Sequence, residues 1–195
     1  TMSDHLPAPA ATARLDHFEP FHFANNLPPD TRETLKAIFA NWSDSEKTEA
    51  LVRQIIDQVP DTLDVRIVAY RFYFYRRRSQ EAANWAASCL SWLSRQLDLP
   101  EDWRQVTADM ADFGHWHAYT RLWLQSLTAY AYNLARLGRE GESLAALDKV
   151  AELDPAGKLG AVHLRGVFTQ SHHDAGMVFR KENEHGHSAR WVADC

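Results

Sequence analysis

The stretch from His115 to Pro155 constrains the fold most, because its hydrophobic spacing fits two helices joined at Gly138. In its first half, apolar residues recur every three or four positions, which keeps them on one face of a helix. These residues are Trp116, Tyr119, Trp123, Leu127, Tyr130, Leu134 and Leu137. Gly138 tolerates the positive φ at which many helices end. Asp154 and Pro155 close the second helix, so the stretch predicts an antiparallel helical hairpin.

The opposite face of the first helix carries a polar stripe at the same spacing. Its members are His117, Arg121, Gln125, Thr128, Tyr132 and Arg136. Every amphipathic helix has a polar side, so a solvated face with internal salt bridges is one reading of the stripe. A surface that binds a partner is the other.

Two stretches resemble tetratricopeptide repeats. LARLGREGESLAALDKVAELDP is similar to the second half of such a repeat, with its tight Gly turn, its small and Leu positions and its terminal Pro. RFYFYRRRSQEAANWAASCL resembles the same hairpin more loosely. The resemblance covers about residues 62–97 and 117–155. It implies an all-α, right-handed stack of three to four antiparallel helical hairpins, an α-solenoid with a concave face.

The composition divides the chain into three parts. Residues 1–29 are rich in Pro and Ala and lack a sustained period, so we expect a mobile N-terminal arm. A helical repeat domain is expected over residues 30–171. The C-terminal tail, residues 172–195, has no clear period, but its apolar residues predict that part of it folds back.

Individual helices are predicted from local patterns. Asp30 with Glu33, and Ser43 with Glu46, are typical helix starts. The apolar run within 61–78 is prone to form a strand, but its length and lack of turn residues favour a buried helix.

Two further helices complete the prediction. The segment from Pro100 to Phe113 shows helical spacing, with Trp103, Val106 and Met110 between its ends. A last helix is expected over about residues 157–171, with an inward face formed by Ala161, Leu164, Val167 and Phe168.

The resemblance implies that the leading helices of successive hairpins line a groove that binds an extended peptide. The residues expected there are Arg71, Phe74, Arg78, His117, Arg121, Gln125, Thr128, Tyr132 and Arg136. Guanidinium groups pair with planar carboxylates, and aromatic rings accept apolar side chains. The sequence therefore predicts a non-catalytic adaptor or chaperone-like module that captures an extended, acidic partner segment. Self-association through the helical surface is a further alternative.

Histidine-based metal binding is the alternative function. The candidate ligands are His115, His117, His172, His173, His185 and His187. Imidazole suits zinc or nickel. Residues two apart on a helix point in different directions, whereas ligand pairs on a helix need spacings of three or four. No metal site and no cofactor is therefore assigned, and surface histidines are the simpler interpretation.

Charge and motifs exclude several other classes. The net charge of −5 disfavours nucleic acid and anionic membranes, although Arg76, Arg77 and Arg78 form a short basic run. No phosphate-binding loop or nucleophile motif is present, so we expect no enzyme. The sequence shows no signal peptide and no apolar run of about 20 residues. Cys89 is expected in the core and Cys195 as a free thiol, which fits a reducing cytoplasm.

Overall fold

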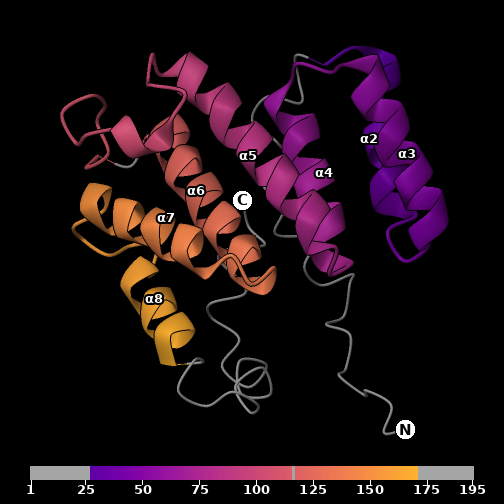
Figure 1. Ribbon diagram of the computed structural model, residues 1–195. Helices are drawn as coiled ribbons and strands as arrows, with labels where there is room; N and C mark the ends of the chain where they lie inside the picture. The colour runs from indigo at the N-terminus through magenta and orange to yellow at the C-terminus, as the bar shows by residue number, and fades with distance from the viewer. Residues whose placement is uncertain (1–26, 116, 171–195) are drawn as a thin grey trace, which may run out of the picture. The chain divides into compact units, whose positions relative to one another are not determined.

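The computed structural model describes residues 27–115 and 117–170, with side chains to residue 168. Within these residues all regular structure is helical, comprising seven α-helices and one short 3-10 helix, without a strand (Figure 1). The predicted all-α class is confirmed. Most of the expected N-terminal arm and all of the expected C-terminal tail lie outside the described residues. By their internal contacts the described residues divide into two compact units, with the boundary between Val65 and Arg66.

The first unit contains α2 (Pro29–Ala40) and α3 (Ser45–Gln58), which pack against each other. The predicted start of α2 is wrong, because Pro28 is the N-cap residue and no side chain caps the helix. Pro29 occupies the first helical position, which suits proline, since the first N–H groups of a helix lack partners anyway. Glu33 instead pairs with Lys36 at 2.7 Å.

The start of α3 is shifted by one residue from the predicted one. Asp44, and not Ser43, is the N-cap residue, and its Oδ1 accepts a hydrogen bond from the Lys47 backbone N at 3.0 Å. Aspartate and serine cap equally well, so the sequence alone could not separate the two neighbours.

The apolar run forms α4 (Leu63–Tyr75), which confirms the predicted helix and excludes the strand alternative. Val65, Val68, Ala69, Tyr70 and Phe72 are all almost completely buried. These positions cover several sides of a helix, which explains why the run shows no clean amphipathic pattern.

In the second unit, α5 (Ser79–Gln96), α6 (Ala118–Arg136), α7 (Glu140–Leu153) and α8 (Ala161–Gln170) follow one another. The central helix is α6, which contacts both α5 and α7, and α7 in turn contacts α8 (Figure 1). Because α6 has neighbours on both sides, most of its length is buried, including Trp123, Leu127 and Leu134 at 0% exposure.

Two turns of this unit have the same design. After α4, the backbone N of Arg77 donates to Phe74 O and that of Arg78 to Tyr73 O, both at 3.0 Å. After α6, Gly138 and Arg139 make the same two bonds, to Ala135 O at 3.0 Å and Leu134 O at 2.9 Å. Arg77 and Gly138 occupy the left-handed position, with φ values of 57° and 75°. Both helices therefore end in a Schellman motif.

An ion pair follows each of these turns at the same spacing. Arg78 Nε donates to Glu81 Oε1 at 2.8 Å, and Arg139 Nε donates to Glu142 Oε1 at 2.8 Å. In both cases the arginine is the N-cap residue of the next helix and the glutamate lies three positions on. The two turns thus share their backbone bonds and their side-chain pairing.

The predicted helix from Pro100 to Phe113 is wrong. Only Trp103–Gln105 form a short 3-10 helix, and turns make up most of the remainder. The last helix is also shorter than predicted, because Gly157 and Gly160 both adopt positive φ before α8 begins. Ala161 and Leu164 are buried as expected, whereas Val167 and Phe168 are half-buried. Across the described residues, no helix combines the length and the apolar character needed to span a membrane.

Candidate functional site

The helices α4, α6 and α8 bring aromatic side chains into contact. The ring of Phe74 on α4 lies 5.7 Å from that of Tyr132 on α6, measured between centroids. The Tyr132 ring lies 6.0 Å from the ring of Phe168 on α8. We call Phe74, Tyr132 and Phe168 the aromatic row. Phe74 and Phe168 are half-buried and Tyr132 is 8% exposed.

Arg136 adds a positive charge at the aromatic row. Its guanidinium carbon lies 5.9 Å from the Tyr132 ring centroid, and its Nε donates to Ser79 Oγ at 3.1 Å. The bond to Ser79 fixes one edge of the guanidinium, and the residue as a whole is exposed. An arginine held in this way presents its remaining N–H groups in a defined direction, which suits a planar carboxylate.

The other predicted residues on α6 are distributed along its whole length. Gln125 and Thr128 are buried, at 8% and 2% exposure, and Thr128 Oγ1 donates to Leu124 O at 2.9 Å. Arg121 is half-buried, and its Nε has no hydrogen-bond partner in the described part of the chain. His117 is exposed at the N-cap of α6. Gln125 and Thr128 are therefore less available to a partner than their place on the polar stripe suggests.

Arg71 on α4 and Arg78 in the turn that follows it are both half-buried. Arg78 pairs with Glu81 at 2.6 Å and stacks over the Tyr73 ring at 4.7 Å. The structure thus brings Phe74, Tyr132 and Arg136 together, whereas Arg78 is engaged in its own turn. Sequence reasoning missed Phe168 and Ser79 as members of this site. Phe168 could have been predicted as a site residue if the last helix had been treated as the first helix of a third hairpin. No pattern in the sequence indicates that Ser79 belongs to the site.

The histidine pair before α6 contacts one carboxylate. His115 Nδ1 lies 2.8 Å from each carboxylate oxygen of Asp112, and His117 Nε2 lies 3.4 Å from Asp112 Oδ2. The hydrogen bond from His115 holds the pKa of Asp112 below its ordinary value. In the described ranges, no group of three or more His, Cys, Asp or Glu is placed to hold a metal ion. The other four candidate histidines lie outside these ranges, so the metal alternative stays a prediction.

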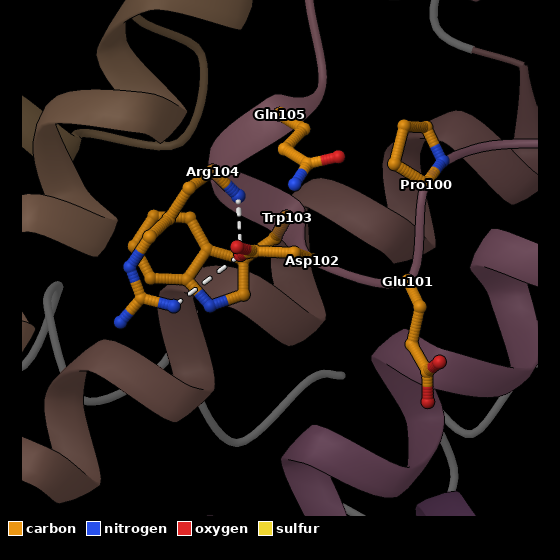
Figure 2. A pocket seen from close by; sticks show the side chains of 6 residues that line it. All are labelled: Pro100, Glu101, Asp102, Trp103, Arg104 and Gln105. Carbon is orange, nitrogen blue, oxygen red and sulfur yellow. Dashed lines mark hydrogen bonds and ion pairs between the residues drawn. The ribbon is translucent and has the colours of Figure 1, made fainter.

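A hollow of about 610 Å³ lies over the loop between α5 and α6 (Figure 2). Its lining is one consecutive segment, Pro100 to Gln105. Asp102 Oδ1 accepts bonds from the Arg104 backbone N at 3.0 Å and from its Nη1 at 3.3 Å, while the Arg104 guanidinium lies 4.4 Å from the Trp103 ring centroid (Figure 2). Binding pockets usually collect polar groups from several elements, and this hollow does not.

Cys89 is a buried thiol on α5, at 3% exposure. Burial raises its pKa to about 12, although the charges of Arg66 and Arg71 act in the opposite direction. The thiolate is the nucleophilic form of cysteine, so this side chain is a core residue and not a reactive group.

Comparison with known proteins shows one relative and no family. No family model matches the chain. The chain is 32% identical over 117 residues to an uncharacterized 19.8 kDa protein in the nifW 5' region of Azotobacter chroococcum mcd 1. The match covers 57% of this chain and 63% of that relative, so the chain spans less than two thirds of the relative's length. No solved structure matches.

Proposed function

We propose that this chain is a non-catalytic adaptor or chaperone-like module, built as a tetratricopeptide-like stack of helical hairpins. In this proposal the leading helices α4, α6 and α8 form the face that captures an extended, acidic segment of a partner protein. The name of the Azotobacter relative gives a gene position and no activity. The proposal therefore rests on the residues of this chain.

The repeated turn supports the hairpin stack. The turns after α4 and α6 share two backbone hydrogen bonds, a left-handed residue and an Arg–Glu pair at equal spacing. A repeat protein uses one supersecondary unit several times, and each unit buries its face against the next. Equivalent turns are what such a unit produces.

The aromatic row is the observation that carries the proposal. Phe74, Tyr132 and Phe168 come from three leading helices that are far apart in sequence, and their rings follow one another at 5.7 and 6.0 Å. Half-buried aromatic side chains such as those of Phe74 and Phe168, close to an arginine, are typical of protein-binding surfaces, because they supply contact area and a charged anchor together. Arg136 occupies this anchoring position at Tyr132.

A photo-crosslinking experiment tests the proposal in the native cell. A benzophenone amino acid in place of Phe168 should trap a specific partner, which mass spectrometry identifies. Pull-downs of that partner with chains that carry no crosslinker then test the face. The double variants Phe74→Ala with Phe168→Ala, and Arg121→Glu with Arg136→Glu, should each lose the partner in these pull-downs while the helical circular-dichroism signal stays intact.

Arg32→Glu with Lys47→Glu is the matched control for the charge reversal. Both residues are exposed, lie in the first unit and give the same change in net charge. This control should retain the partner. If the two test variants capture the same partner as the unmodified chain, the adaptor proposal is wrong.

A further inference from the structure

Five arginines gather at the two matching turns. Arg76, Arg77 and Arg78 belong to the turn after α4, and Arg136 and Arg139 to the turn after α6. The hydrogen bond from Arg136 Nε to Ser79 Oγ, at 3.1 Å, joins the two turns. We call these five residues the turn edge. The acidic residues that follow in the same turns are Glu81, Glu140 and Glu142. Five arginines against three glutamates give the turn edge a net positive charge.

Three of the five guanidinium groups are already engaged: Arg76 lies over the Phe72 ring, 5.2 Å from its centroid, and the other two form ion pairs. Arg78 pairs with Glu81 at 2.6 Å and Arg139 with Glu142 at 2.8 Å. The Arg77 side chain is exposed and has no hydrogen bond or ion pair within the described residues. Within the described part of the chain, Arg136 makes one hydrogen bond, from Nε to Ser79 Oγ, besides its contact with the Tyr132 ring. Among the residues that the structure describes, no carboxylate pairs with Arg77 or Arg136, so the turn edge presents these two as uncompensated cations.

The backbone conformation at Arg77 is unfavourable for a residue that has a Cβ atom. Arg77 adopts φ 57°, whereas the matching turn has glycine at the same position, Gly138, with φ 75°. A residue with a Cβ costs about 1 kcal/mol or more in this region, and glycine costs much less. The Schellman motif explains the backbone conformation at Arg77 but not the arginine side chain. A strained residue whose side chain has no role in the fold points to a role in binding.

We propose that the turn edge binds a carboxylate-rich segment of a partner protein, with Arg77 and Arg136 as the contacting guanidinium groups. This inference rests on the proposed adaptor function and names the place where the partner's acidic residues bind. Interspersed Glu81, Glu140 and Glu142 favour discrete carboxylates over the continuous phosphate charge of nucleic acid, as does the net charge of −5.

Fluorescence anisotropy with a labelled peptide of alternating glutamate and serine tests the inference. The full chain should bind this peptide at about 20 mM salt, and binding should weaken as salt screens the charges. Arg77→Gly and Arg136→Gln should each weaken binding about tenfold, the scale of one lost charge-assisted hydrogen bond. Arg77→Gly should at the same time raise the melting temperature, because it relieves the strain. Arg77→Asn, which tolerates the left-handed region, should lose the same affinity.

Asp98→Gly is the matched control. Asp98, at the end of α5, also adopts a left-handed conformation with φ 53°, and its replacement by glycine removes no positive charge. It should raise the melting temperature and leave peptide binding intact. The inference is overturned if the unmodified chain does not bind the peptide, if Arg77→Gly binds as the unmodified chain does, or if a single-stranded oligonucleotide of equal charge binds more tightly.

The adaptor proposal is tested separately, through Phe74 and Phe168. If Arg77→Gly keeps the crosslinked partner while the Phe74→Ala, Phe168→Ala variant loses it, the adaptor proposal stands and the turn-edge inference fails. If neither variant loses the partner, both fail.

Discussion

The indole Nε1 of Trp123 on α6 donates a hydrogen bond of 2.9 Å to Ser94 Oγ on α5, and both residues are almost completely buried. Trp123 also contacts the ring of Phe113 at 5.7 Å, which links the loop before α6 to the same core. A single polar contact thus fixes the rotation of the central helix against its neighbour, because a buried indole N–H needs a partner.

Ser94→Ala should destabilise the protein by about 1–3 kcal/mol, since it leaves the Trp123 N–H buried without an acceptor. Urea unfolding followed by tryptophan fluorescence measures the free energy of unfolding. Ser91→Ala is the control on the same helix, because the Ser91 hydroxyl accepts only an exposed bond from Arg95 at 3.2 Å. Its effect should stay within about 0.5 kcal/mol. Equal losses in the two variants would contradict a stabilising role for the Trp123 bond.

Two glycines near the α6–α7 turn should respond in opposite directions to alanine. A Cβ would meet nothing within 4 Å at either Gly138 or Gly141, so only the backbone differs. Gly138 has φ 75°, where Gly138→Ala should cost about 1 kcal/mol. Gly141 lies inside α7, where Gly141→Ala should stabilise by up to about 1 kcal/mol. Thermal unfolding of the pair checks the signs, and the same sign for both would refute the argument.

The sequence predicts helices well where one hydrophobic period persists. It fails where side chains form hydrogen bonds with backbone groups that a helix would otherwise use. The segment from Pro100 to Phe113 has helical spacing, yet Met110 is 46% exposed while Trp103 and Val106 are buried. Asp102 accepts a bond from the Arg104 backbone N, and Asp112 from the His115 backbone N. Such local bonds stabilise turns at the expense of a helix, and hydrophobic periodicity does not register them.

The candidate site could be predicted only in part, for a different reason. Phe74, Tyr132 and Arg136 were expected on the same surface, and they do lie together. Gln125, Thr128 and Tyr132 share one stripe of α6, and all three are buried, because α6 has helices on two sides. A helix between two neighbours buries polar positions too, and Thr128 satisfies its hydroxyl on the backbone of its own helix. The period of one helix cannot reveal how many neighbours it has.

Asp64 should make stability depend on pH between about 4 and 6. It is 2% exposed, and desolvation raises its pKa from 3.8 to about 6. The folded state therefore binds the proton more tightly than the unfolded state does. The stabilisation from this tighter proton binding at Asp64 is fully present below pH 4 and is lost as the pH rises to 6. The free energy of unfolding falls by at most about 3 kcal/mol over this range. Urea unfolding of the unmodified chain and of Asp64→Asn, from pH 4 to pH 7.5, measures the difference.

The free energy of unfolding of Asp64→Asn, relative to the unmodified chain, should grow over this range and then level off above pH 6. Other carboxylates titrate in both proteins and cancel in the comparison. A constant difference between the two proteins across the range would show that Asp64 ionises in the folded state as freely as in water.

The Cys89 thiol should react only when the protein opens. Burial and a pKa of about 12 leave almost no accessible thiolate at neutral pH. In a Cys195→Ser background, where Cys89 is the single cysteine, a thiol-specific disulfide reagent should label the native protein slowly and the urea-unfolded protein at once. Adding Ser94→Ala should speed native labelling about tenfold for every 1.4 kcal/mol of stability that it removes, because opening exposes the thiol. Ser91→Ala should leave the labelling rate unchanged.

Fast labelling of the folded protein that does not respond to Ser94→Ala would contradict this prediction. It would mean that the reagent reaches Cys89 without unfolding and that the thiol is reactive in the folded protein.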